Sequence, residues 1–205
     1  MTSFPILLRL EGRTCVVVGA GRIAAAKTAG LLRHGAQVVV VAPKAVSWIR
    51  DKSRSGELVW RPRTFTARDV RSAFLVVAAT NSVAVNHHVF LACRTHRVLC
   101  NVVDDPEHCD FFYPAVVRRG ALQIAISTDG QSPALAARLR KEMERQFGPE
   151  WAPFLEHIGR LRQQLQSAKL PLKRKREQLA QLAGPRAFLD FQRRRRAARR
   201  GKRRS

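Results

Sequence analysis

The chain has 205 residues, 45% of them hydrophobic, which allows one packed α/β core and a small second domain and argues against wholesale disorder. The formal net charge is +23, from 38 Lys and Arg against 15 Asp and Glu. No stretch reaches about 18 uninterrupted apolar residues, and the N-terminal region lacks the pattern of a secretory signal. We therefore expect a soluble cytoplasmic protein that does not cross a membrane.

The positive charge divides into two parts. Residues 169–205 hold 15 Lys and Arg against Glu177 and Asp190, a local charge of +13 that leaves +10 for residues 1–168. The tail at 186–205 is rich in arginine, and we expect a solvated or disordered end there. The charge on the body suits a polyanionic small molecule as well as it suits a nucleic-acid backbone.

Neither the cysteines nor the histidines form a convincing metal or disulfide pattern. Four cysteines occur without a CxxC pair among them: Cys15, Cys93, Cys100 and Cys109. We interpret them as small buried hydrophobes in a reducing compartment. His87 and His88 are adjacent on an expected helix, where neighbouring side chains point about 100° apart, so they cannot easily face one site. We predict no metal site.

Apolar, β-branched runs alternate with helical patterns up to residue 113. The expected strands are Thr14–Val18, Gln37–Val41, Leu58–Trp60, Phe74–Ala79 and Val98–Val103. The expected helices between them are Ile23–Arg33, Ser47–Ser53 and Val83–Thr95. This alternation predicts an α/β fold with a parallel, Rossmann-type sheet covered by helices on both faces.

Beyond Pro114 the rhythm changes. Residues 115–127 predict two strands joined at Arg119-Gly120, which form a β-ribbon rather than another crossover unit. A helix follows, with Ser132 as N-cap and Pro133 at its first position. Two more helices are expected at Trp151–Leu165 and Leu172–Leu182. We therefore divide the chain into a sheet domain at 1–113, a ribbon-and-helix segment at 114–147, a helical C-terminal part at 148–185 and the basic tail.

The turn from Gly19 to Ala24 follows the first expected strand and opens the first expected helix. This is the context that the dinucleotide-binding fingerprint requires. Gly19 makes the tight turn, Gly21 lets the backbone approach a pyrophosphate, and Ala24 allows close packing of helix on strand. The helix N-terminus also favours an anion. The turn predicts a nucleotide site, the alternative being an ordinary tight turn.

Polar residues also follow other expected strands, whose carboxyl ends border the ligand crevice of such a sheet. Thr80-Asn81 follows the fourth strand. Pro43-Lys44 follows the second, without the acidic residue that often binds the ribose of NAD, so the residues leave NAD and NADP both open. Asp104-Asp105 follows the fifth strand and offers a candidate general base, although Asp105 can instead form a turn with Pro106.

In combination and order, five stretches resemble one family, the precorrin-2 dehydrogenases. Their module also forms the N-terminal part of siroheme synthases, and some members act as sirohydrochlorin ferrochelatases. The stretches are Phe4-Pro5-Ile6, Val16 to Lys27, Ala78 to Asn81, Cys100 to Pro106 and Ser127 to Pro133. The resemblance covers residues 1 to about 165 and leaves the basic tail outside.

The resemblance implies an NAD-dependent oxidation of precorrin-2 to sirohydrochlorin, in the biosynthesis of siroheme or a related tetrapyrrole. It also implies a homodimer, formed through residues 114–147. Whether the chain also inserts Fe²⁺ into the product stays open, because no cluster of metal ligands is visible in the sequence.

The resemblance further assigns site residues. Asp104 matches the active-site aspartate of the family, and as general base it would take the proton. The residues assigned to NAD are Gly19, Gly21, Arg22 and Ile23 on the pyrophosphate side, Pro43 and Lys44 on the adenosine side, and Thr80, Asn81 and Asn101 in the rest of the pocket. The residues expected to approach the substrate are Ser127, Thr128 and Ser132. The candidates for attracting its carboxylates are Arg118, Arg119, Arg138 and Arg140.

Two other functions stay open. A different NAD(P)-dependent Rossmann dehydrogenase would keep the glycine turn but would not explain the segments 101–106 and 127–133 together. A binding protein would use the Rossmann unit as a ligand sensor and the tail to bind nucleic acid. The tail has little regular aromatic interleaving and no nucleic-acid motif precedes it, so we expect no nucleic-acid partner.

Overall fold

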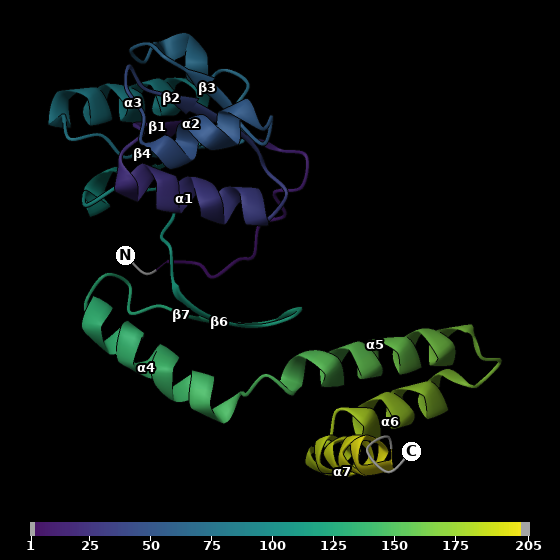
Figure 1. Ribbon diagram of the computed structural model, residues 1–205. Coiled ribbons are helices and arrows are strands. Elements are labelled where there is room, and N and C mark those ends of the chain that lie inside the picture. The colour runs from purple at the N-terminus through teal and green to yellow at the C-terminus, as the bar shows by residue number, and fades with distance from the viewer. Residues whose placement is uncertain (1–2, 202–205) are drawn as a thin grey trace. The chain divides into compact units, whose positions relative to one another are not determined.

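The computed structural model describes residues 3–201, and the chain forms two compact units, Met1–Tyr113 and Pro114–Ser205. The first unit contains a parallel sheet with the strand order β3-β2-β1-β4-β5 (Figure 1). Its strands are β1 (Thr14–Val18), β2 (Gln37–Val41), β3 (Val59–Arg61), β4 (Leu75–Ala78) and β5 (Leu99–Val102). The Rossmann-type sheet that the sequence predicts is therefore confirmed.

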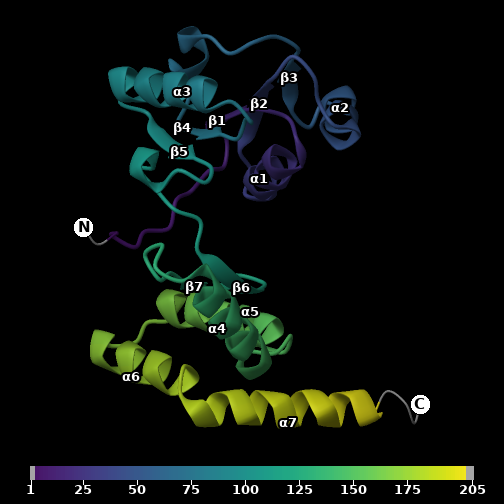
Figure 2. The ribbon, with the colours of Figure 1, turned by 90° about the vertical axis from the view of Figure 1, so that its left-hand side faces the viewer.

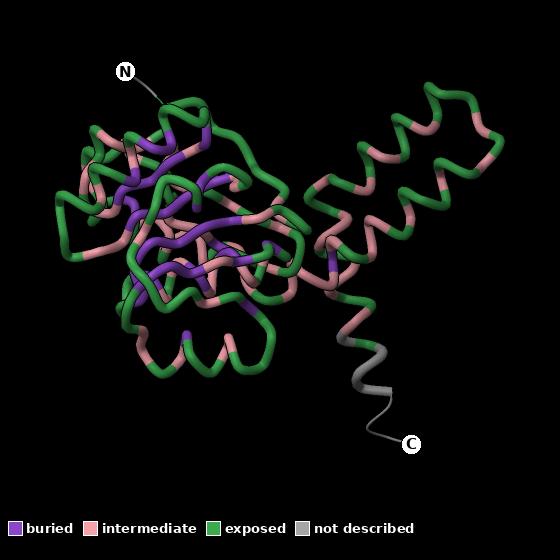
Figure 3. The backbone as a smooth tube through the Cα atoms, turned by 90° about the horizontal axis from the view of Figure 1, so that it is seen from above, coloured by how far each residue is buried: buried purple, intermediate pink, exposed green. Residues whose placement is uncertain are grey.

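Helices cover both faces of this sheet. They are α1 (Arg22–Arg33), α2 (Ser47–Arg54) and α3 (Val83–His96), with the short 3₁₀ helices η1 (Ala67–Val70) and η2 (Pro106–His108). Figure 2 shows α1 and α2 on one face and α3 on the other. Val17 shares a core cluster with Leu31 of α1, whereas its neighbour Val16 shares the other cluster with Val89 of α3. Successive side chains of β1 thus anchor opposite faces, and the strands form the buried centre seen in Figure 3.

The strand order determines where a ligand can bind. From β1 the chain proceeds to β2 and β3 on one side, and then returns to β4 and β5 on the other. The carboxyl ends of β1 and β4 therefore lie at the point where the strand order reverses. Ligands of open parallel sheets bind in the crevice at this point.

The second unit begins with a two-stranded antiparallel ribbon, β6 (Ala115–Arg119) and β7 (Leu122–Ile126), followed by α4 (Pro133–Gln146). Gly120 joins the strands with a φ of 61°, and the Ser132 hydroxyl caps α4 by accepting the Leu135 N–H at 3.2 Å. Arg119 donates to Phe147 O at 2.7 Å and to Glu144 O at 3.0 Å. The ribbon thus satisfies carbonyl groups at the C-terminus of α4, which otherwise lack partners.

Three helices complete the unit: α5 (Trp151–Ser167), α6 (Leu172–Leu182) and α7 (Pro185–Gly201). The structure places residues 186–201 of the expected tail in α7, where Arg193 and Arg194 are exposed and an aromatic side packs on α5. Phe188 stacks on Trp151 with ring centroids 4.3 Å apart, and Phe191 lies 5.4 Å from Phe154. Residues 202–205 of the expected tail lie outside the described residues. None of the described helices combines the length and apolar character of a membrane span.

Candidate active site

The glycine turn stands directly at the carboxyl end of β1. Gly19 has a φ of 105°, and its N–H donates to Val41 O of β2 at 2.9 Å. A Cβ on Gly19 would lie 2.3 Å from Ala79 O, the carbonyl that follows β4. Both the left-handed backbone and this close approach exclude every residue except glycine. Gly19 therefore holds the turn tightly against β4.

Gly21 leaves open space in front of α1. It is the N-cap residue of the helix, no side chain among the described residues caps it, and no atom lies within 4 Å of the position of a Cβ. The first N–H groups of α1 are therefore without intrahelical partners, at the positive end of the helix dipole. Arg22 and Ile23 are exposed beside them, Ile23 at 53%. An open, uncapped helix start of this kind fits the pyrophosphate of a dinucleotide.

The loop after β2 borders the same turn. Val46 N–H donates to Ala20 O at 3.0 Å, which holds the loop containing Pro43 and Lys44 against the glycine turn. Pro43 and Lys44 are both exposed. Trp60 of β3 donates from Nε1 to Ala42 O at 3.0 Å and fixes the start of the loop. The two residues predicted for the adenosine side thus lie next to the turn Gly19–Ile23 and the start of α1. We call this turn and helix start the pyrophosphate cradle.

The loop after β4 is held by two hydrogen bonds between Thr80 and Asn86, which the sequence analysis did not predict. Thr80 donates from Oγ1 to Asn86 Oδ1 at 2.7 Å, and Asn86 Nδ2 donates to Thr80 O at 3.1 Å. The hydroxyl of Ser82 caps α3 by accepting the Val85 N–H at 3.3 Å. Asn81 is exposed between these contacts. In the sequence, the sign of these hydrogen bonds was the polar residue Asn86 within the otherwise apolar first turn of α3.

Asp104 is the exposed carboxylate of the turn that follows β5. Its φ is 61°, and the turn is closed by the Asp105 N–H, which donates to Val102 O at 3.3 Å. Asp105 instead pairs with His108, whose Nδ1 lies 2.7 Å from Asp105 Oδ2. Of the two neighbouring carboxylates, Asp105 is thus engaged by His108, whereas Asp104 is exposed at the carboxyl end of β5.

Asn101 is a buried residue of β5 whose amide is engaged by the segment after Asp104. The residue is 6% exposed, and its Nδ2 donates to Phe111 O at 2.8 Å and to Cys109 Sγ at 3.3 Å. Its amide thus ties the segment after Asp104 back to β5. The structure therefore places Asn101 beneath the turn that carries Asp104, and its assignment to the cofactor site stays a prediction.

Lys27 and Tyr113 form a contact that the sequence analysis did not assign. The Lys27 ammonium lies 3.7 Å from the centroid of the Tyr113 ring, a cation–π contact. Burial lowers the pKa of Lys27, and the negative charge of Asp104 partly opposes this shift. Lys27 is therefore a half-buried cation within electrostatic reach of Asp104. In the sequence, Lys27 was marked only as the last residue of the stretch Val16 to Lys27 in the family resemblance, and it lies four residues after Ile23 on the same face of α1.

The predicted substrate loop lies in the second unit. Its hydroxyls organise the loop itself: Ser127 Oγ accepts the Asp129 N–H and Thr128 Oγ1 accepts the Ser132 N–H, both at 3.1 Å. Asp129 and Gly130 have φ values of 54° and 80°. The loop is therefore a tight, self-bonded turn that leads into α4.

Three of the four arginines proposed to attract substrate are engaged in the second unit. Arg119 binds carbonyl groups of α4 and its C-cap, Arg138 pairs with Glu142 at 2.9 Å, and Arg140 pairs with Glu144. Arg118 is exposed, and within residues 3–201 we observe no ion pair for it. Arg118 is thus the exposed arginine of the four for which no ion pair is observed among residues 3–201, and Arg138 is also largely exposed beside its partner Glu142.

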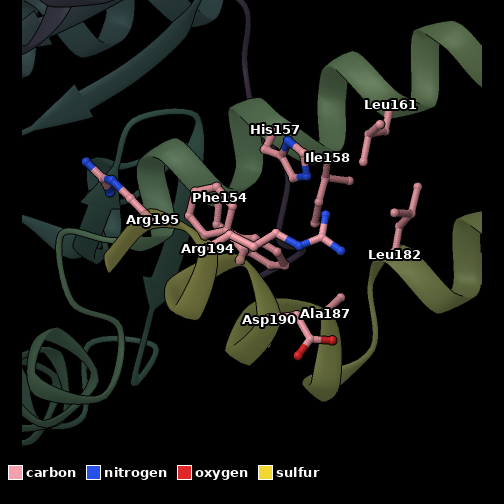
Figure 4. A pocket seen from close by; sticks show the side chains of 10 residues that line it. Phe154, His157, Ile158, Leu161, Leu182, Ala187, Asp190, Arg194 and Arg195 are labelled. Atoms are coloured by element: carbon pink, nitrogen blue, oxygen red, sulfur yellow. The ribbon is translucent and has the colours of Figure 1, made fainter. Parts of the chain in front are cut away.

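A pocket of ≈470 Å³ lies elsewhere, between α5 and α7 in the second unit (Figure 4). Apolar side chains such as Ile158 and Leu182 line it, with Arg194 and Asp190 among its polar residues. No residue predicted for the cofactor or the substrate lines this pocket. Across the described part of the chain, no group of three or more His, Cys, Asp or Glu residues is arranged to hold a metal ion.

Two protein families match successive parts of the chain. A family described as putative NAD(P)-binding matches residues 6–115, and one described as sirohaem biosynthesis protein central matches residues 119–146. The solved structure of SirC, a precorrin-2 dehydrogenase, superposes with a TM-score of 0.80 at 28% identity, over 91% of this chain and 92% of that one.

Curated relatives share the name siroheme synthase. That of Nitrosospira multiformis is 37% identical over 196 residues, which cover 93% of this chain and 42% of the relative. Siroheme synthase 1 of Serratia proteamaculans is 38% identical over 165 residues, 80% of this chain and 35% of the relative. This chain therefore spans less than half the length of these two relatives. It belongs to the putative NAD(P)-binding family, and its residues 119–146 match the central domain of sirohaem biosynthesis proteins, which confirms the resemblance found in its sequence.

Proposed function

We propose that this chain oxidises precorrin-2 to sirohydrochlorin with NAD as the hydride acceptor, a reaction of siroheme biosynthesis. One observation carries the proposal: the uncapped start of α1 after β1 and the exposed Asp104 after β5 stand at the same edge of the sheet, with β4 between the two strands. The likeness to SirC and to the siroheme synthases supports the choice of substrate.

The reaction removes a hydride and a proton from a reduced tetrapyrrole, so the site needs an acceptor for each. Bound NAD supplies the hydride acceptor. The N–H groups at the start of α1 bind the pyrophosphate, and the carboxylate of Asp104 accepts the proton. His108 engages the neighbouring Asp105, which leaves Asp104 as the base that meets the substrate.

We assign Lys27 and Arg118 to the attraction of the negatively charged substrate. Precorrin-2 carries several carboxylates, which a lone aspartate would repel. Lys27 offsets the negative charge of Asp104, because it lies within electrostatic reach of that carboxylate. Arg118 is exposed and offers a second cation. Each of these cations can attract a carboxylate of the substrate, and Asp104 stays available as the base.

We assign Ser127, Thr128 and Ser132 to substrate binding. Each hydroxyl accepts one backbone N–H within its own loop and keeps its proton to donate to a carboxylate. We further propose a homodimer formed through residues 114–147, because within the described chain each strand of the β6–β7 ribbon pairs on one side only. The protein then works in the cytoplasm, a reducing compartment that suits its four free cysteines.

The function is tested by anaerobic turnover. Purified protein is mixed with NAD and precorrin-2, and formation of sirohydrochlorin and NADH is followed by absorbance. We expect both products to appear together, and faster with NAD than with NADP. Binding of NAD without turnover of precorrin-2 would contradict the proposal. Addition of Fe²⁺ after sirohydrochlorin has formed then tests iron insertion as a separate reaction with iron as substrate.

A further inference from the structure

Cys109 lies in the segment after Asp104, and its sulfur contacts the backbone on both sides of that residue. The Sγ atom of Cys109 lies 3.2 Å from Val102 O and 3.2 Å from Asp105 O. Val102 is the last residue of β5, and Asp105 directly follows Asp104. The thiol therefore bridges the two ends of the turn in which Asp104 stands.

The bridge matters because the turn holds Asp104 in an uncommon conformation. A φ of 61° lies in the left-handed region, which residues other than glycine adopt uncommonly, although Asp and Asn adopt it more readily than most. The backbone supplies one long hydrogen bond across the turn, from the Asp105 N–H to Val102 O at 3.3 Å. The thiol proton, shared between the carbonyls of Val102 and Asp105, reinforces this closure.

The surroundings of the sulfur keep it in place and protonated. Asn101 donates from Nδ2 to Cys109 Sγ at 3.3 Å and to Phe111 O at 2.8 Å, so the amide holds both the sulfur and the chain beyond it. Only a protonated thiol can donate to a carbonyl oxygen. Burial raises the pKa of Cys109, which keeps the thiol protonated at neutral pH.

We propose that Cys109 is a positioning residue for Asp104, whose thiol holds the turn so that the carboxylate stays directed at the substrate. This inference rests on the proposed function of Asp104 as the proton acceptor. A displacement of about 1 Å at a reacting group can lower turnover about 100-fold. Loss of the bridge therefore lowers kcat and leaves NAD binding intact, because the pyrophosphate cradle is formed by the turn after β1.

The test compares Cys109→Ala with Cys109→Ser. We expect Cys109→Ala to lower kcat about 10- to 100-fold with an unchanged affinity for NAD, and Cys109→Ser to recover most of the loss because a hydroxyl also donates to carbonyls. In the Asp104→Asn background, Cys109→Ala should cause little further loss, since the residue acts through Asp104. Equal losses in both backgrounds, or an unchanged kcat in Cys109→Ala, would overturn the proposal.

A second readout does not depend on turnover. Hydrogen exchange of the Asp105 amide reports whether the turn is closed, and we expect it to accelerate in Cys109→Ala but not in Cys109→Ser. Cys15→Ala is the matched control, because Cys15 is a buried thiol of β1 that belongs to the other core cluster, whereas Cys109 packs against the cluster that contains Val102. Wild-type protein that cannot oxidise precorrin-2 would refute the proposed function alone, and unchanged exchange in Cys109→Ala would refute the bridge.

Discussion

Gly19 and Ala79 approach so closely that a Cβ on Gly19 would lie 2.3 Å from the carbonyl oxygen of Ala79. Since the clash is with backbone, β1 and β4 would have to separate to relieve it. The φ of 105° at Gly19 adds strain to any side chain there. We expect Gly19→Ala to destabilise the protein by about 2–4 kcal/mol and to abolish NAD binding. Urea unfolding and a calorimetric NAD titration measure the two effects.

Gly21→Ala is the matched control for that substitution. A Cβ at Gly21 meets no atom within 4 Å, and its φ of −80° suits any residue. We expect normal stability but weaker NAD binding, because the methyl group occupies the space through which a pyrophosphate approaches α1. Equal NAD affinity in Gly21→Ala and wild type would contradict the cradle assigned to this turn.

Lys27→Met removes the cation that lies within reach of Asp104. Burial already lowers the pKa of Lys27, so the folded protein holds this charge unfavourably, and its removal should leave stability unchanged or higher. Activity should fall, because the substrate's carboxylates lose a charged partner: we expect kcat/KM for precorrin-2 to drop about 10- to 100-fold. Steady-state kinetics and thermal melts test this, and Lys27→Arg should retain more activity. A destabilised Lys27→Met variant with normal kinetics would refute it.

Asp69→Asn tests the acid stability of the first unit. Burial alone would raise the pKa of Asp69, but hydrogen bonds from Arg63, the Thr66 backbone and Arg61 outweigh it and hold the pKa well below the usual value of 3.8. The stabilisation is therefore complete above pH 3.8 and is lost as the pH falls through the lower folded-state pKa. We expect Asp69→Asn to lose about 2 kcal/mol at neutral pH and progressively less in acid.

The control for Asp69→Asn is Asp51→Asn, which removes the charge of an exposed aspartate. Asp51 and Arg54 form an exposed ion pair at 3.1 Å, with side chains 65% and 76% exposed. Such surface pairs contribute within about 0.5 kcal/mol. Urea unfolding across the acid range should therefore separate the two variants clearly. Parallel stability curves for Asp69→Asn and wild type would contradict the depressed pKa.

Phe188→Ala and Leu189→Ala test whether α7 packs as described. Phe188 stacks on Trp151, whereas its neighbour Leu189 is 52% exposed. We expect Phe188→Ala to destabilise the second unit by about 2 kcal/mol, and Leu189→Ala to change stability by less than about 0.5 kcal/mol. Thermal unfolding of both variants measures the difference. Two equally silent substitutions would mean that α7 does not pack on α5.

The sheet, the helices around it and the glycine turn could be predicted from sequence because each depends on local pattern. Buried parallel strands appear in the sequence as apolar runs. The tight turn at Gly19 and the open backbone at Gly21 follow from the spacing of these glycines between a strand and a helix. Ser132 and Pro133 likewise mark the start of α4. These features depend on neighbouring residues along the chain, which a sequence displays directly.

The remainder of the candidate site depends on tertiary contacts. Asn101 turns beneath the Asp104 turn because its amide finds Phe111 O ten residues later, which no local pattern announces. The contacts of Cys109 with two backbone carbonyls and of Lys27 with the Tyr113 ring likewise depend on partners that only the fold brings near. The charge of the arginine-rich tail predicted a solvated or disordered end, and it gave no sign that Phe188 of α7 stacks on Trp151.

The central claim is that Asp104 and the cradle at the start of α1 together oxidise precorrin-2. The most direct test is a single anaerobic experiment that compares wild type with Asp104→Asn under saturating NAD. We expect wild type to form one NADH per sirohydrochlorin, and Asp104→Asn to bind NAD equally well but turn over about 10²- to 10⁴-fold more slowly. Full activity in Asp104→Asn would contradict the account.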